Sequence, residues 1–375
     1  MKVLKNLRIF TEDGIVENGF IRFDTLIREI GQGDVEGEDM NGKTLIPGFV
    51  DQHIHGLLGH DIMDGNYEGL NEIATNLPKE GTTSFLATTM TETKENIIKA
   101  LRNIRNYNNI NQNIGAEILG VHLEGPFISS IYKGAQREDA IQDISIELFD
   151  EYYQASGELI KQVTIAPELN NANKLIKHMV RKDVVASIGH SNTSGEEALE
   201  AIKNGAKCFT HAYNGMSKLH HRNIGAVGAM FLSDTYSELI CDRIHTSDNA
   251  TRLLYKVKTS DKLILITDSM RAKLLGDGEY ELGGQKVIVN NSEARLEDGV
   301  LAGSTLFMNE AIKNMQDITE CGIYELIKMS SSNPAILHNV YDRKGSIKVG
   351  KDADLLVIKD DLSIDEVYCK GTKTA

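Results

Sequence analysis

Two histidines separated by one residue, His53 and His55, are the first side chains in this sequence that could do metal chemistry. If the segment is extended, residues two apart point to the same side, so both imidazoles can reach one cation. Histidine nitrogens are common ligands of Zn²⁺ and related ions. The pair alone is weak evidence for a metal site, and its weight depends on what the rest of the chain supplies.

Four further ionisable residues, each at the end of a short apolar run, supply the remaining ligand types: Glu124, His190, His211 and Asp268. Protein cores seldom place an ionisable group at the same end of so many strands by chance. We therefore expect a site for a divalent metal cation. Zn, Fe, Mn and Co all accept a histidine and carboxylate ligand set, and the number of ions, one or two, stays open.

Hydrolysis is the reaction expected from such a site. Histidine and carboxylate ligands with an open coordination position lower the pKa of bound water towards about 7. Asp268 has no histidine close by in sequence, so it could accept the proton of the water and pass it to a leaving group. The alternatives for Asp268 are a further metal ligand or a helix N-cap.

The elements that must position these side chains are eight short apolar runs without polar alternation, separated by stretches long enough for a helix. The runs cover residues 44–50, 82–87, 117–123, 163–166, 184–188, 207–210, 237–241 and 263–267. Such runs are typical of parallel strands buried on both faces. Eight of them predict an α/β fold with a closed (β/α)8 TIM-like barrel, and a doubly wound open sheet is the alternative. In a barrel, the loops after the strands meet at one mouth, which would gather the six side chains.

Helix signals lie between the runs. Ser194 followed by Glu197 is a capping-box signature, and the helix that it opens would end at Asn204-Gly205. Residues 92–107 and 305–320 also have apolar residues at helical spacing.

The two ends of the chain have a different pattern. Residues 1–46 and 345–375 contain short β segments divided by turns such as Asp13-Gly14. We expect both ends to form one small β module, and residues 47–344 to form the barrel domain.

Composition excludes several classes of function. The 375 residues include 40 Lys+Arg and 54 Asp+Glu, a net charge of −14, which argues against a nucleic-acid partner. No segment approaches the roughly 18 apolar residues that cross a bilayer, and the first ten residues alternate too quickly for a signal peptide. Four isolated cysteines are typical of reduced thiols. We therefore expect a cytoplasmic protein with no membrane partner.

Longer strings of sequence are specific enough to indicate a family. They are PGFVDQHIHG (47–56), HLEGPF (122–127), KGA (133–135), APE (166–168), GHSN (189–192), HAYNGM (211–216), TDSM (267–270), LAGS (301–304) and GKDAD (350–354). In these strings and their order, the chain resembles the amidohydrolase superfamily, and within it the deacetylases of amino-sugar phosphates.

The resemblance implies a role for each matching residue. Glu124, His190 and His211 would hold the main metal, and His53 and His55 could hold a second. Asp268 would be the catalytic acid and base. The implied substrate contacts are Ala135, Asn214, Gly215, His221, Arg222, His245, Leu301, Ala302 and Gly303.

The implied reaction is hydrolysis of the acetamide of N-acetylglucosamine 6-phosphate to glucosamine 6-phosphate and acetate, in amino-sugar catabolism. N-acetylgalactosamine 6-phosphate is the nearest alternative substrate. The family is often dimeric, so a homodimer is expected, and a partner chain could complete the phosphate site. Arg222 suits a phosphate because its guanidinium offers a planar pair of donors to two oxygens.

Three residues depart from the family pattern. Gln136 stands where many members have histidine, Arg243 where glycine is usual, and Gly215 where alanine is common. Gln136 would alter one sugar contact, and Arg243 would bring a bulky cation near the pocket.

Two rival functions stay open at this point. Cyclic-amide hydrolases commonly use a carboxylated lysine at the fourth strand end, where this chain has Ala166-Pro167-Glu168. A non-enzymatic sugar-phosphate binding protein would have no need of Asp268 beside a full ligand set.

Overall fold

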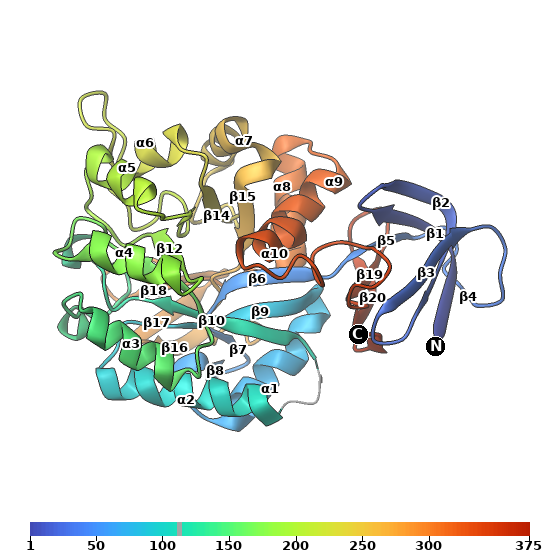
Figure 1. Ribbon diagram of the computed structural model, residues 1–375, viewed down its shortest axis with the longest axis horizontal. Helices are drawn as coiled ribbons and strands as arrows, with labels where there is room; N and C mark the ends of the chain where they lie inside the picture. The colour runs from blue at the N-terminus through green and yellow to red at the C-terminus, as the bar shows by residue number, and fades with distance from the viewer. Residues whose placement is uncertain (111–114) are drawn as a thin grey trace.

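A computed structural model describes residues 1–110 and 115–375 as an α/β barrel with a separate β-sheet beside it (Figure 1). Eight parallel strands form the barrel sheet within these residues. In hydrogen-bonded order they are β6 (Phe49–Ile54), β9 (Thr82–Thr89), β10 (Glu117–Glu124), β11 (Ile160–Ile165), β12 (Val185–Ile188), β13 (Cys208–Phe209), β14 (Tyr236–Ile240) and β15 (Leu263–Ile266). The predicted (β/α)8 architecture is confirmed.

Backbone hydrogen bonds between the last residues of β6 or the residue after it and the residues after β15 close the barrel at the carboxyl end of its strands. The N–H of Asp268 donates to the carbonyl of His53 at 2.8 Å, and the N–H of His55 donates to the carbonyl of Ser269 at 2.9 Å. The first and last strands are therefore neighbours, and two residues far apart in sequence, His53 and Asp268, are held side by side.

The first apolar run is not a single strand, as the sequence had predicted, because the structure divides it at Gly48. β5 (Thr44–Pro47) pairs with strands of the separate sheet, and only β6 enters the barrel. A Cβ atom at residue 48 would lie 2.1 Å from Oγ1 of Thr83. Glycine is required there because the chain passes this close to β9 when it crosses from one sheet to the other.

Helices surround the barrel sheet (Figure 1). They are α1 (Tyr67–Asn76), α2 (Lys94–Ile110), α3 (Ile146–Ala155), α4 (Ala172–Arg181), α5 (Gly195–Lys203), α6 (Gly225–Leu232), α7 (Asp248–Lys262), α8 (Met308–Thr319), α9 (Ile323–Ile327) and α10 (Asn333–Leu337). The helical spacing over 92–107 and 305–320 corresponds to α2 and α8. Among the described helices, none has the length and apolar character needed to cross a membrane.

Helix α5 begins with the predicted capping box. The hydroxyl of Ser194 accepts from the N–H of Glu197 at 3.2 Å, and the carboxylate of Glu197 accepts from the N–H of Ser194 at 2.8 Å. We expect Ser194→Ala to lower the free energy of unfolding by about 1 kcal/mol, measured as a shift of the urea midpoint. Ser194→Asp, which retains a side-chain acceptor, is the control. Equal midpoints for the two variants would show that the cap contributes nothing.

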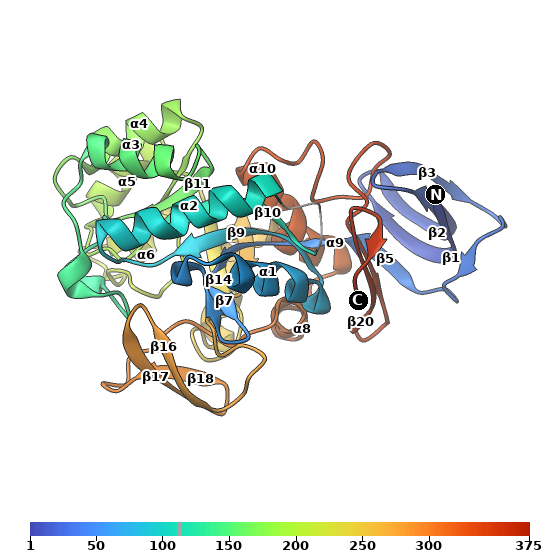
Figure 2. The ribbon, with the colours of Figure 1, turned by 90° about the horizontal axis from the view of Figure 1, so that it is seen from below.

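The separate sheet contains both ends of the chain, as predicted (Figures 1 and 2). Its strands are β1 (Lys2–Thr11), β2 (Gly14–Phe23), β3 (Ile27–Gln32), β4 (Glu38–Asp39), β5, β19 (Leu355–Ile358), β20 (Ile364–Cys369) and β21 (Thr372–Lys373). Near the start of the C-terminal part of this module, Ile347 makes only an isolated bridge with Thr11. The division into domains at residues 46 and 345 stays a prediction.

A three-stranded antiparallel sheet between β15 and α8 was not predicted from the sequence. It comprises β16 (Gly278–Leu282), β17 (Gln285–Asn290) and β18 (Glu293–Leu296), and Figure 2 shows it in orange, projecting from the barrel. Gly283-Gly284 between alternating residues is a hairpin signal that could have revealed it. A smaller hairpin, β7 (Gly56–Leu57) and β8 (His60–Asp61), follows β6.

Candidate metal centre

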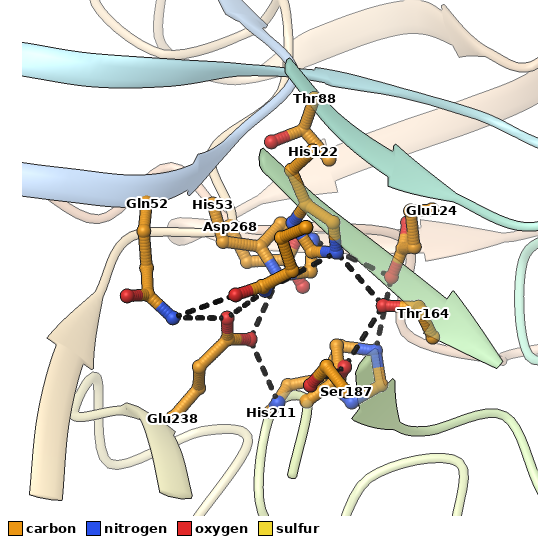
Figure 3. Close-up of polar contacts among 12 residues, drawn as sticks. Gln52, His53, Thr88, His122, Glu124, Thr164, Ser187, His211, Glu238 and Asp268 are labelled. Carbon is orange, nitrogen blue, oxygen red and sulfur yellow. Dashed lines mark hydrogen bonds and ion pairs between the residues drawn. The ribbon is translucent and has the colours of Figure 1, made fainter. Parts of the chain in front are cut away.

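The predicted metal ligands and Asp268 converge at the carboxyl ends of the barrel strands. His53 lies on β6 and His55 directly after it, Glu124 ends β10, and the other three follow β12, β13 and β15. All six side chains are buried. Figure 3 shows His53, Glu124, His211 and Asp268 directed toward one another from four strands.

Glu124 lies at the centre of the cluster. Its Oε1 is 3.1 Å from Nε2 of His211 and 3.2 Å from Nε2 of His190. The same oxygen is 3.4 Å from Nε2 of His53, while Oε2 is 3.3 Å from Nε2 of His55. Two possible metal-binding groups therefore share Glu124: one with His190 and His211, the other with His53 and His55.

Each of the four imidazoles has its other nitrogen, Nδ1, directed at an oxygen that accepts a hydrogen bond. The acceptors are the backbone carbonyls of Thr88, Tyr132 and Asn214 for His55, His190 and His211, at 3.3, 2.9 and 3.1 Å, and the carboxylate of Glu238 for His53, at 3.0 Å. A histidine that donates through Nδ1 presents the lone pair of Nε2 on its other side. All four Nε2 atoms thus face the centre of the cluster as potential ligands.

The buried carboxylates favour positive charge in the cluster. Burial alone would lower the pKa of His53, but Asp268, Glu124 and Glu238 raise this pKa well above its usual value. Burial would also lower the pKa of His55, and Asp268 and Glu124 raise it to about 9. The same balance of charges that stabilises a protonated imidazole stabilises a bound cation.

The donor set fits a divalent metal ion. Nε2 of His53 is buried and makes no hydrogen bond with any described residue, although it faces two carboxylates. A buried polar atom without a partner costs free energy, and a bound cation would satisfy it. Imidazole nitrogen and carboxylate oxygen are the ligands that zinc, iron, manganese and cobalt accept.

Asp268 borders the cluster and also faces the open space above it. Its Oδ1 is 3.2 Å from Nε2 of His55 and 3.5 Å from Nε2 of His53. Burial alone would raise the pKa of Asp268, but the two histidines outweigh burial and lower this pKa to about 2. The N-cap alternative is wrong, because the next described α-helix begins at Met308.

The fourth strand end carries a structural carboxylate. Glu168, in the loop after β11, accepts from the hydroxyl of Ser191 at 2.7 Å and from the N–H of Asn192 at 2.6 Å. It therefore orders the loop that carries His190, and no lysine follows β11 in the APE string. A bridging carboxylated lysine has no counterpart at this position.

A cavity of about 360 Å³ lies over the cluster of histidines and carboxylates. Six of the predicted substrate contacts line it: Ala135, Asn214, Gly215, His245, Leu301 and Gly303. His245 is held in place by Asp242, whose Oδ2 is 2.6 Å from Nδ1 of the imidazole. Ala302 is fully buried and does not line the cavity.

His221 and Arg222 are not brought to this cavity. Both are exposed, and Nη1 of Arg222 lies 2.8 Å from Nε2 of His221. Arg243 is not a lining residue either: its guanidinium pairs with Asp248 at 3.3 Å. The φ angle of Arg243 is 64°, a conformation that glycine adopts most easily.

Gln136, which was expected to alter a sugar contact, also lines the cavity. The lining residues that were not predicted at all as substrate contacts are Met90, Gly134, Leu282, Arg295 and Val300. Gln136 holds the Glu124 carboxylate in place, because its amide donates to Oε2 of Glu124 at 2.7 Å and accepts from the N–H of Thr91 at 2.7 Å. Arg295 is the one Lys or Arg in the described lining. The alternation of residues 278–296 could have predicted a hairpin here, but not that it reaches the cavity.

Comparisons with known proteins cover the whole chain. The amidohydrolase family model matches residues 44–374. The N-acetylglucosamine-6-phosphate deacetylase of Bacillus subtilis is 42% identical, over 98% of this chain and 96% of that protein. The N-acetylgalactosamine-6-phosphate deacetylase of Escherichia coli O157:H7 is 33% identical, over 98% of both. The crystal structure of the Thermotoga maritima N-acetylglucosamine-6-phosphate deacetylase has a TM-score of 0.91 and 37% identity, over 100% of this chain and 99% of that one.

Proposed function

This chain belongs to the amidohydrolase family, and we propose that it hydrolyses the acetamide of N-acetylglucosamine 6-phosphate to glucosamine 6-phosphate and acetate. The family resemblance expected from the sequence is confirmed, and the protein is a hydrolytic enzyme. The observation that carries the substrate proposal is a carboxylate and histidine cluster beneath a cavity, in a chain 42% identical to a deacetylase of that name.

We propose that Glu124, His190 and His211 hold one divalent cation, and that His53 and His55 hold a second with Glu124 shared between them. The geometric support is the convergence of four Nε2 atoms on the two oxygens of Glu124. A divalent cation in such a site polarises a carbonyl group and activates water as a nucleophile near neutral pH.

Asp268 carries the proton in the proposed reaction. As a carboxylate, it accepts a proton from the attacking water while the new C–O bond forms at the acetyl carbon. It then donates this proton to the sugar nitrogen while the C–N bond breaks, which releases the free amine and acetate. Its place on the cavity wall, beside His55, supports this role.

The other proposed substrate contacts orient the sugar phosphate over Asp268. Asn214, Gly215, His245 and the 301–303 loop come from separate parts of the cavity wall, so together they can define one orientation of the sugar. We propose that the protein is a homodimer in which Arg222 reaches the phosphate in the cavity of the other copy. The exposure of Arg222 outside its own cavity supports this arrangement.

Phosphate recognition can be tested on the two candidate arginines, Arg222 and Arg295. A guanidinium contributes about 1.5–3 kcal/mol through hydrogen bonds to an anion, so Arg222→Gln and Arg295→Gln should each raise KM for the phosphorylated sugar roughly 10- to 100-fold. KM for unphosphorylated N-acetylglucosamine should rise much less. Arg243→Gln, which alters an arginine outside the cavity, is the matched control. If a variant changes KM equally for both sugars, the arginine substituted in that variant does not bind the phosphate.

Acetate release from the two epimeric amino-sugar phosphates, with metal analysis of the same preparation, tests the function as a whole. The relative from Escherichia coli O157:H7 favours N-acetylgalactosamine 6-phosphate as the second candidate substrate. We expect a higher kcat/KM for the glucosamine derivative. Metal-loaded protein that deacetylates neither epimer would overturn the proposed function.

A further inference from the structure

The four imidazoles of the metal centre are oriented in two different ways. His55, His190 and His211 direct Nδ1 at backbone carbonyls, whereas His53 directs Nδ1 at the side chain of Glu238. A backbone carbonyl cannot be removed by substitution, so Glu238 is the one orienting group of the four that a mutation can change. Glu238 lies on β14, is fully buried, and faces the interior of the barrel (Figure 3).

The hydrogen-bond donors around Glu238 define the role of both its oxygens. Oε1 accepts from the amide nitrogens of Gln52 and Gln162, each at 2.7 Å. Oε2 accepts from the backbone N–H of His211 at 3.2 Å, and Nδ1 of His53 lies 3.0 Å from the same atom. Amide nitrogens and a backbone N–H can only donate, so both oxygens are acceptors.

The orientation of the Gln52 amide is itself held by a further residue. Nε2 of His338 donates to Oε1 of Gln52 at 3.1 Å, which leaves the nitrogen of that amide facing Glu238. Both oxygens of Glu238 therefore act as hydrogen-bond acceptors. The proton in the contact between Oε2 of Glu238 and Nδ1 of His53 then belongs to Nδ1.

The consequence is a single available ligand atom on His53. With Nδ1 donating to Glu238, Nε2 is the nitrogen left for an ion, and it is buried without a hydrogen bond to any described residue. It faces Oε1 of Glu124 at 3.4 Å. We propose that Glu238 is a positioning residue that holds His53 in the Nδ1–H form and directs Nε2 at the ion bound with His55 and Glu124. This inference rests on the proposed metal-dependent function.

Glu238 acts through His53 and not on the substrate, because it does not line the cavity. It belongs to a third possible metal-binding group, with His53 and His122. In that group Nδ1 of His53 already donates to Glu238, and Nε2 of His122 is engaged with the hydroxyl of Thr164 at 2.8 Å. These contacts make the third group a hydrogen-bonded layer beneath the ion site.

Glu238→Gln keeps the size of the side chain and replaces one oxygen by NH2. If the NH2 group occupies the Oε2 position, it opposes the N–H of His211 and makes His53 carry its proton on Nε2, toward the ion. If it occupies the Oε1 position, it opposes the amide nitrogens of Gln52 and Gln162. Loss of a hydrogen-bond partner behind a metal ligand typically weakens metal binding about 10- to 100-fold, and we expect a loss of this size at the His53 side.

The test is a Zn²⁺ titration of the full-length protein by equilibrium dialysis with elemental analysis. Wild-type protein should bind two ions per chain. Glu238→Gln and His53→Gln should each retain one tightly bound ion and weaken the other about 10- to 100-fold. At the ion next to His53, the double variant should bind Zn²⁺ no more weakly than His53→Gln alone, because Glu238 reaches that ion through His53. Thr164→Val, which removes a hydroxyl bonded to His122 in the same buried layer, is the matched control and should retain both ions.

A second measurement uses the wild-type chain, so it does not depend on the folding of a variant. NMR of Zn²⁺-loaded protein with ¹⁵N-labelled histidine should show His53 protonated at Nδ1, assigned by the loss of its signals in His53→Gln. A proton on Nε2 would overturn the inference. So would unchanged Zn²⁺ binding in Glu238→Gln, additive losses in the double variant, or a single ion per wild-type chain.

Acetate release from the same preparations separates this inference from the proposed function. If the wild-type protein releases acetate but Glu238→Gln binds Zn²⁺ as the wild type does, the proposed role of Glu238 is wrong and the proposed function stands. Wild-type protein that shows the expected binding pattern but releases no acetate would remove the function and leave the role of Glu238.

Discussion

Asp268→Asn is expected to lower kcat for acetate release by about 10²- to 10⁴-fold, the usual contribution of a general acid and base. Asparagine has nearly the same shape, but it can neither accept the proton of the attacking water nor return it to the leaving amine. The low pKa of Asp268 means that the wild-type residue is a carboxylate at neutral pH, as the first proton transfer requires.

The metal content of Asp268→Asn distinguishes the two roles still open for this residue. If Asp268 transfers protons, the variant should bind metal as the wild type does, and KM should change less than kcat. If Asp268 is mainly a ligand, metal content should fall together with activity. A variant with kcat close to the wild-type value would exclude the proton-transfer role.

Removal of metal is the second change with a large expected effect. Exhaustive dialysis against a chelator should abolish acetate release, and readdition of Zn²⁺, Mn²⁺ or Co²⁺ should restore it, because in the proposed mechanism a bound cation polarises the carbonyl group and activates water. The stability of the protein should change as well. At a free metal concentration one hundred times Kd, a bound ion stabilises the folded state by about 2.7 kcal/mol, which is measurable as a lower Tm after chelation.

Glu124→Gln extends the chelation experiment to the protein itself. Glu124 contacts all four imidazoles, so its loss should mimic the chelated wild type and should not be rescued by added metal. A chelator saturated with Zn²⁺ beforehand is the control for non-specific effects. Full activity in protein shown by elemental analysis to be metal-free would contradict the proposed mechanism.

The convergence of the proposed metal ligands and Asp268 was predictable from the sequence because these residues stand at strand ends. A run such as 184–188 is apolar apart from Ser187, so the ionisable residue that follows it, in Gly189-His190, is conspicuous. Alternation on an extended strand also placed His53 and His55 on one side, and both Nε2 atoms do face Asp268. Periodicity carries this information because it depends only on local backbone geometry.

The layer beneath the metal centre could not be predicted in the same way. Gln52, Gln162 and Glu238 lie within strands, and their sequence neighbours do not show which of them meet. Their contacts join β6, β11 and β14, so they depend on closure and stagger of the barrel. The strand boundary at Gly48 was missed for a related reason, since the chain leaves one sheet and enters another without a break in apolar character.

The position of Arg222 shows the limit of a motif. The resemblance implied a substrate contact for Arg222, yet this residue lies outside the cavity of its own chain, because a motif fixes distance along the chain and not the direction in which a loop projects. For Arg295 the prediction and the structure differ in the opposite way, because it lines the cavity although it was not predicted as a substrate contact. Nothing in its immediate sequence indicated a role, and the β16–β18 sheet brings it to the cavity wall.

The closure of the barrel has a mechanical consequence. The N–H of Asp268 donates to the carbonyl of His53, so the hydrogen bond that closes the barrel also sets the spacing between the proposed proton carrier and a proposed metal ligand. If this hydrogen bond lengthens or breaks, both Asp268 and His53 move. Heating or denaturant should therefore lower the rate of acetate release before the rest of the barrel unfolds.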